Sequence, residues 1–292
     1  MLALFRFVTL VLLLVVSEVS AATYHSHKFE NNTLIIQTNE YQVELTALSS
    51  GAIEVHYYND QQPNFPSFAI DESINRALLE SNLKVSDWSL TLSVDNLKAV
   101  INKKNMQIRF YRDDTLLVEE ESGYFNTSTL QGFRFKLDKS EKLMGTGERV
   151  LGMDRRGHRL PLYNRAHYGY ETESKQMNFS IPAVMSDKKY ILLFDNSAKG
   201  WIDLAHSESD ILQFEAVGGR TSYVVFSGET YPDLINQYVN VTGKQPTPPR
   251  WAFGNHASRF GYKSQKEVLD TIALYKQLNI PVDSIILDLY WF

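Results

Sequence analysis

The sequence predicts a β-rich sandwich domain followed by the beginning of an α/β domain. Between about residues 33 and 227, short apolar runs alternate with turn residues, which is typical of antiparallel β-sandwiches. The proline-rich stretch 245–249 then forms a stiff connector. After it, the pattern changes to strand, helix and strand, which predicts two parallel strands joined by a right-handed crossover.

In the first part, turn residues separate the expected strands. Asp113 and Asp114 indicate a hairpin, and Gly218 and Gly219 indicate another between the last two strands. The three glutamates at 119–121 are interpreted as a solvated hairpin end. His25 and His27 are placed in a disordered terminus. Strands are expected at residues 33–38, 41–48, 51–58, 88–94, 97–103, 106–111, 115–119, 190–194, 211–216 and 221–226.

Helix signals then mark the second part. Pro232 can begin a helix and Gly243 can end it. Beyond the connector, residues 251–257 are expected to form a strand. Ser264 and Glu267 form a capping box at the start of the next helix. The final strand is expected at 284–289, an apolar run that is broken only by an aspartate.

Composition limits the function classes. The 292 residues carry a net charge of −5, and 43% of them are hydrophobic, which excludes a mostly disordered chain. The mild acidity argues against nucleic acid as the main partner. The absence of cysteine excludes disulfides, zinc–thiolate sites and thiol nucleophiles. No metal or organic cofactor is implied, and the oligomeric state stays open.

The first 21 residues resemble a signal peptide. Arg6 precedes an apolar run at 7–16, and small residues follow up to Ala21. The run is too short for a comfortable membrane span. We therefore expect an exported protein without membrane attachment after cleavage, periplasmic or extracellular. The lack of cysteine favours a bacterial envelope.

Five blocks after residue 142, in the same order, resemble glycoside hydrolase family 31, the retaining α-glucosidases and α-xylosidases. Each block alone is weak, but the ordered set is specific. Residues 23–141 share only the β-rich character. The blocks are MGTGER at 144–149, IP with FDN at 181–196, VTGKQPTPPRWA at 241–252, SRFGYKSQKE at 258–267 and IPVDSIILD at 280–288.

This resemblance implies an N-terminal sandwich followed by a (β/α)₈ barrel, of which only the first β-α-β unit lies in this sequence. We expect the signal peptide at 1–21, the sandwich at 22–228, a helix and connector at 229–249 and the start of the barrel at 250–292. Barrel strands three to eight, and both catalytic aspartates of the family, would lie beyond residue 292. No catalytic residue is therefore assigned, and this chain alone is expected to be inactive.

The resemblance also implies part of a sugar site. Asp288 matches the aspartate that holds the sugar in the −1 site, and a charge inside this apolar strand needs a partner if it is buried. Phe260 matches an aromatic pocket position. Tyr290 is the preferred one of two aromatic residues after Asp288. Arg259 either pairs with a carboxylate of the catalytic domain or lies on the surface.

The expected substrate is an α-linked gluco-oligosaccharide, cleaved with retention. A loop at 160–170 resembles the segment that reaches over the barrel mouth, but Ala166 stands where many maltases carry an aspartate. His167, Tyr168 and Tyr170 could then form a different acceptor subsite. A 4-α-glucosyltransferase and an α-xylosidase therefore stay open as alternatives. The non-enzymatic alternative is a carbohydrate-binding β-sandwich.

Overall fold

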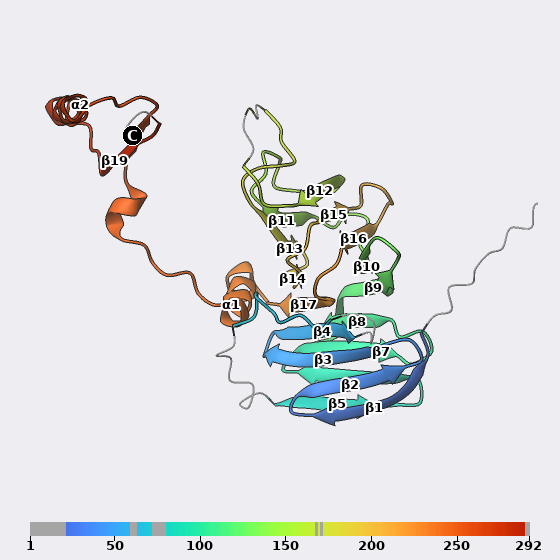
Figure 1. Ribbon diagram of the computed structural model, residues 1–292. Coiled ribbons are helices and arrows are strands. Elements are labelled where there is room, and N and C mark those ends of the chain that lie inside the picture. The colour runs from blue at the N-terminus through green and yellow to red at the C-terminus, as the bar shows by residue number, and fades with distance from the viewer. Residues whose placement is uncertain (1–21, 59–62, 72–79, 167–168, 170–171, 290–292) are drawn as a thin grey trace, which may run out of the picture. The chain divides into compact units, whose positions relative to one another are not determined.

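The computed structural model describes residues 22–58, 63–71, 80–166, 169 and 172–289. The chain divides into two compact units, residues 1–243 and 244–292 (Figure 1). The units are described separately. Of the helices in the described part of the chain, none has the length and apolar character needed to cross a membrane.

The first unit is a sandwich of two antiparallel sheets, as predicted (Figure 1). The eight-stranded sheet has the order β1 (Tyr24–Glu30), β2 (Thr33–Thr38), β3 (Gln42–Ser49), β4 (Ala52–Tyr58), β17 (Ser222–Ser227), β14 (Tyr190–Phe194), β13 (Ser180–Ser186) and β11 (Leu143–Gly147). The nine-stranded sheet has the order β12 (His158–Leu162), β15 (Gly200–Leu204), β16 (Ile211–Ala216), β10 (Gln131–Lys136), β9 (Thr115–Asn126), β8 (Ile108–Arg112), β7 (Leu97–Asn102), β6 (Ser89–Val94) and β5 (Ser81–Val85).

The main core lies between the sheets, and strands such as β6 and β7 bury alternate residues in it. An aromatic cluster joins the two layers. The rings of Phe194 and Phe214 stack with centroids 4.5 Å apart, and Phe133 lies 5.0 Å from Tyr223. Stacked and edge-on ring pairs add to the stabilisation that burial alone gives.

Helix α1 (Tyr231–Thr242) buries the outer face of the eight-stranded sheet. Leu234 and Val241 of the helix share a second core cluster with Val224 and Phe226 of β17. Because β17 is covered on both faces, its central residues, Tyr223 to Phe226, form a continuous apolar run. The predicted limits of the helix are confirmed: Thr230 is the N-cap, a proline occupies the first turn, and Gly243 follows with φ 87°.

The second unit is a short helix followed by a β-α-β element. It contains η2 (Arg250–Phe253), β18 (His256–Arg259), α2 (Gln265–Gln277) and β19 (Ser284–Leu287). β18 and β19 pair in parallel, as predicted. The expected strand at 251–257 is wrong over residues 251–255, because η2 ends at Phe253 and β18 begins only at His256. The amide of Ala252 donates to the carbonyl of Pro249 at 2.9 Å, which closes a helical turn before the strand begins.

Three local expectations in the sandwich are also wrong. β16 and β17 do not form a hairpin around Gly218 and Gly219, because they belong to different sheets. His25 and His27 do not lie in a disordered end, because β1 pairs with β2. The glutamates at 119–121 do not form a hairpin end, because β9 continues to Asn126 and buries Glu120 completely.

Candidate functional site

Two of the predicted sugar-binding residues lie at the same end of the parallel β18–β19 pair. Arg259 and Leu287 are paired across the strands. Phe260 and Asp288 directly follow them, so both come at the carboxyl ends of neighbouring strands. In α/β barrels this end carries the active site. Tyr290, the third predicted residue, lies outside the described residues.

Asp288 is not buried inside a strand. β19 ends at Leu287, and Asp288 is exposed, with its carboxylate accepting the amide of Leu289 at 2.7 Å. The expectation of a charge within the strand is therefore wrong, because the strand is shorter than its apolar run. Phe260 is 59% exposed. The sugar-binding roles of both residues stay predictions.

The loop from β18 to α2 is held by Glu267. Its carboxylate forms an ion pair with Arg259 at 3.0 Å and accepts the amide of Lys263 at 2.9 Å. Its amide donates to the hydroxyl of Ser264 at 3.2 Å. Half of the capping box is thus formed as predicted, while the carboxylate reaches the amide of Lys263 instead of that of Ser264. Arg259 has a partner within its own unit.

A brace at the other end of the strands was not anticipated from the sequence. The amide of Asn255 donates to Asp283 Oδ2 at 2.9 Å, and the amide of Asp283 donates back to the carbonyl of Asn255 at 2.8 Å. A Cβ on Gly254 would lie 2.0 Å from Asp283 Oδ2, so a larger residue there would displace this carboxylate. Asp283, part of the last resembling block, therefore fixes the register of β18 and β19.

The MGTGER block joins two segments of the sandwich. Gly147 has φ 89°, and a Cβ there would lie 2.7 Å from the amide nitrogen of Ile181. Arg149 is buried and donates through Nη2 to the carbonyl of Pro161 at 2.7 Å and to Ser180 Oγ at 3.0 Å. Burial, reinforced by the nearby Arg155, lowers the pKa of Arg149 to about 10. The block therefore ties β12 to β13.

The loop after β12 carries a small polar cavity of about 340 Å³. Asn164 Oδ1 accepts the amide of Ser180 at 2.6 Å, which fixes the start of the loop. The ring of Tyr163 lies 5.5 Å from Lys199 Nζ. Ala166 is exposed. His167, Tyr168 and Tyr170, the proposed acceptor residues, lie outside the described residues.

No group of three or more His, Asp or Glu side chains in the described part of the chain is arranged to hold a metal ion. His25 and His27 lie on β1, where His27 Nδ1 is 2.6 Å from the hydroxyl of Tyr24.

Comparison with known proteins matches both units. Residues 42–203, more than half of the chain, match the glycosyl hydrolase 31 N-terminal galactose mutarotase-like domain. Residues 245–292 match the glycosyl hydrolases family 31 TIM-barrel domain.

Relatives match across both units. An alpha-glucosidase 2 of Bacillus thermoamyloliquefaciens is 29% identical over 73% of this chain, and an alpha-xylosidase of Saccharolobus solfataricus is 28% identical over 85%. A family 31 dextranase of Flavobacterium johnsoniae, solved with glucose, aligns with 93% of the chain at a TM-score of 0.86 and 24% identity. The chain spans 28%, 35% and 34% of these three proteins. The chain belongs to glycoside hydrolase family 31, of which it contains the N-terminal sandwich and the start of the barrel.

Proposed function

We propose that this chain is the N-terminal part of an enzyme that cleaves α-glucosidic bonds of oligosaccharides with retention. One observation carries the proposal: in a family 31 chain, Phe260 and Asp288 follow paired residues at the carboxyl ends of two parallel strands. The relatives named alpha-glucosidase and alpha-xylosidase support the substrate class.

In this proposal the chain binds the sugar and does not break the bond. The carboxylate of Asp288 accepts hydrogen bonds from adjacent hydroxyl groups, and the ring of Phe260 packs against a C–H face of the sugar. Retaining hydrolysis needs a nucleophilic carboxylate and an acid/base carboxyl about 5–5.5 Å apart. Later barrel strands would supply both groups, so the 292-residue chain alone would bind sugar without turnover.

A second candidate is transfer of the glucosyl unit to another sugar. Ala166, at the exposed position where many maltases carry an aspartate, favours it, because the next sugar would lose a charged contact there. An α-xylosidase would differ in its −1 site, which must distinguish xylose from glucose by the CH₂OH group that only glucose carries. Assays must therefore separate glucose from xylose, and water from sugar as the acceptor.

The test begins with the intact mass of the naturally expressed protein, which we expect to be far above the 33.5 kDa of this chain. That protein is then incubated with maltose, isomaltose and aryl α-glucosides and α-xylosides, and the first product anomer is read by NMR. Release of the α-anomer is expected. Release of the β-anomer, or no turnover of any α-glycoside, would overturn the proposal.

Two variants of the same protein locate the sugar contact. D288N is expected to lower kcat/KM by at least tenfold, because hydrogen bonds to a charged group contribute about 1.5–3 kcal/mol. D270N is the matched control, since Asp270 is an exposed acid on α2 whose carboxylate pairs with Lys266. Equal activity of D288N and D270N would remove Asp288 from the site.

We also propose that the protein is exported after removal of residues 1–21. The charged start, apolar run and small residues before Ala22 support this. N-terminal sequencing of the protein from its natural source should begin at Ala22. Retention of Met1 in the purified protein would contradict export by this route.

A further inference from the structure

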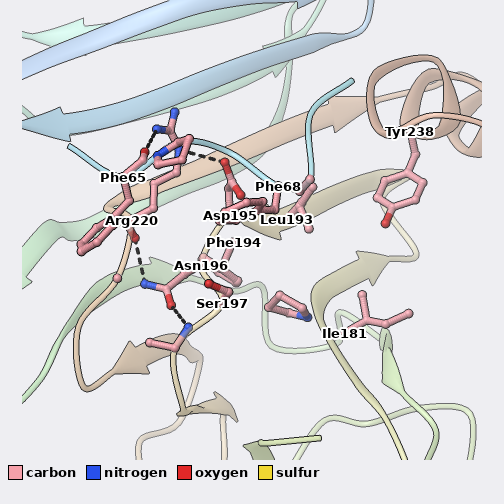
Figure 2. A pocket seen from close by; sticks show the side chains of 15 residues that line it. Phe65, Phe68, Ile181, Leu193, Phe194, Asp195, Asn196, Ser197, Arg220 and Tyr238 are labelled. Atoms are coloured by element: carbon pink, nitrogen blue, oxygen red, sulfur yellow. Dashed lines mark hydrogen bonds and ion pairs between the residues drawn. The ribbon is translucent and has the colours of Figure 1, made fainter. Parts of the chain in front are cut away.

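The sandwich unit contains a cavity of about 350 Å³ on the outer side of the eight-stranded sheet, beside α1 (Figure 2). Residues from five separate segments line it: 65–69, 181–182, 193–198, 219–220 and Tyr238 of α1. Its volume lies at the lower end of the range for small-molecule sites, about 300–1,000 Å³. Residues 181–182 and 194–196 belong to the second of the resembling blocks, and no binding site was expected there.

One partly buried arginine, Arg220, fixes two of these walls. Arg220 pairs through Nη2 with Glu54 Oε1 at 2.7 Å and through Nε with Asp195 Oδ2 at 2.8 Å. Its Nη1 donates to the carbonyl of Phe65 at 2.7 Å, so the segment carrying the aromatic rim is held to the sheet (Figure 2). The carboxylates of Glu54 and Asp195 both pair with Arg220. These three side chains therefore present no unpaired charge to the cavity.

Asn196 fixes a further wall, which residues 196–198 and 218–220 form. Its Nδ2 donates to the carbonyls of Gly218 and Arg220, each at 2.8 Å, and its Oδ1 accepts the amide of Ala198 at 2.8 Å. Gly219 has φ 91°, and a Cβ there would lie 2.8 Å from Asn196 Nδ2. The cavity is thus formed by its own framework before any ligand arrives, which lowers the cost of binding.

Two phenylalanine rings at the rim of the cavity, those of Phe65 and Phe68, are exposed. Phe68 is 85% exposed and Phe65 is 43% exposed. Two exposed phenylalanines beside a formed cavity indicate an interaction site, because apolar surface that stays in water adds nothing to the stability of the fold. A ligand with an apolar face and no net charge matches this combination. A pyranose offers that face in its C–H groups, and its hydroxyl groups can bond to Ser197 and to main-chain carbonyls.

We propose that this cavity is a carbohydrate subsite on the sandwich, which holds a neutral glucosyl unit against Phe68. The choice of an α-glucan rests on the function proposed above. The geometry of the subsite does not depend on that function. It gives the sandwich a role in holding an oligosaccharide in addition to supporting the barrel.

The test measures binding by the 292-residue chain itself, by titration calorimetry and saturation-transfer NMR, with isomaltotriose and maltotriose as probes. F68A is expected to weaken the affinity about tenfold, the loss typical for one stacked ring. F68Y should restore it. W88A is the matched control, since Trp88 is also 81% exposed but does not line the cavity. Both side chains, Phe68 and Trp88, are exposed enough to be changed without unfolding the protein.

Binding that falls in F68A and is kept in F68Y and W88A supports the subsite. Absence of saturable binding by either probe overturns it. Equal affinity of the parent and F68A also overturns it, and would place the sugar elsewhere in the chain. The activity assays of the natural protein are read separately: turnover without F68A-sensitive binding rejects the subsite alone, and F68A-sensitive binding without turnover rejects the proposed catalysis alone.

Discussion

Replacing Glu120 with glutamine should remove part of the pH dependence of stability. Glu120 is fully buried between the sheets. Its Oε1 accepts the hydroxyls of Tyr57 at 2.8 Å and Tyr223 at 2.7 Å, and its Oε2 accepts the amide of Ile108 at 2.9 Å. Burial raises the pKa of Glu120 to about 7, although these three hydrogen bonds oppose the shift.

The sign follows from the raised pKa. Between pH 4.5, the ordinary value for a glutamate, and about pH 7, the folded chain holds a proton that the unfolded chain has lost. The stabilisation that protonated Glu120 gives the folded chain is therefore fully present below pH 4.5 and is lost as the pH rises through 7. A difference of about 2.5 pKa units corresponds to about 3 kcal/mol of unfolding free energy.

Glutamine keeps the shape of the side chain but cannot ionise. It can accept both tyrosine hydroxyls, but its amide then faces the amide of Ile108, which leaves two buried donors unpaired at a cost of about 1–3 kcal/mol. E120Q should therefore be less stable than the parent at pH 4.5 and equally or more stable at pH 8. Urea unfolding at both pH values measures the difference in unfolding free energy between E120Q and the parent. The ionisable groups that both proteins share cancel in this difference.

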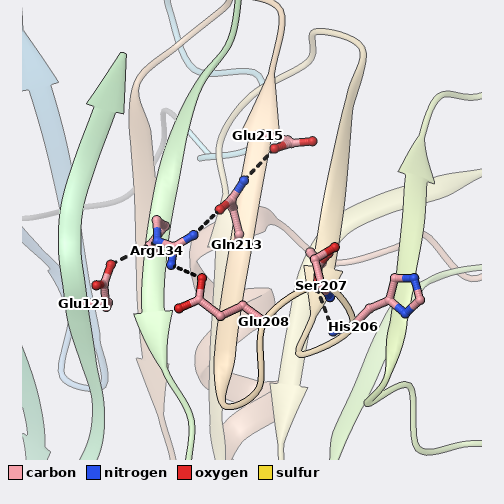
Figure 3. Close-up of polar contacts among 8 residues, drawn as sticks. Glu121, Arg134, His206, Ser207, Glu208, Gln213 and Glu215 are labelled. Carbon is pink, nitrogen blue, oxygen red and sulfur yellow. Dashed lines mark hydrogen bonds and ion pairs between the residues drawn. The ribbon is translucent and has the colours of Figure 1, made fainter. Parts of the chain in front are cut away.

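The matched control for E120Q is the same substitution at Glu121, the next residue along β9. Its side chain points to the outer face, where it pairs with Arg134 at 3.0 Å (Figure 3). Partial burial opposes the shift, but the hydrogen bond from Arg134 holds the pKa of Glu121 below its usual value. E121Q should thus lose stability relative to the parent as the pH rises from acid. An E120Q difference that is independent of pH, or that has the slope of E121Q, would refute the reasoning.

Three further changes test the framework. R220M breaks buried ion pairs and should lower the unfolding free energy by about 3–5 kcal/mol in urea titration. G132A places a Cβ 1.8 Å from a carbonyl oxygen of β16 and should cost about 1–3 kcal/mol, whereas G152A, with no atom within 4 Å, should change stability by less than about 0.5 kcal/mol. S264A removes the hydroxyl that accepts the amide of Glu267 and should destabilise α2 by about 1 kcal/mol, measured by hydrogen exchange.

Strands with strong apolar patterns and clear turns could be predicted from the sequence. Residues 33–38, 190–194 and 211–216 form strands with the predicted limits. β11, β12 and β13 were missed, because their glycines, prolines and serines resemble turn residues. Their pairing depends on contacts made far along the chain, such as that of Arg149 with Pro161 and Ser180. Propensity alone does not contain such contacts.

The position of the candidate barrel site could be predicted from the order of the strands and the helix along the chain. The parallel pair that brings Phe260 and Asp288 to one end followed from the strand–helix–strand pattern. The exact end of β19 did not follow, because the apolar pattern resumes with Leu289 after Asp288, whereas the strand ends at Leu287. The sandwich cavity was not predictable, since its walls come from five distant segments.

The glutamates at 119–121 illustrate why the sequence misled at one point. Three consecutive charges suggest a solvated turn, but successive side chains in a strand face opposite sides. In β9 this sends Glu119 and Glu121 outward and Glu120 into the core. A buried carboxyl is tolerated only where donors meet it, and here the two hydroxyls come from strands of the opposite sheet, 63 and 103 residues away. Without the two tyrosines, Glu120 would keep only the amide of Ile108 as a donor, and its burial would cost more free energy. The position of Glu120 in the core therefore depends on residues far away in the sequence, which the glutamate triplet alone does not reveal.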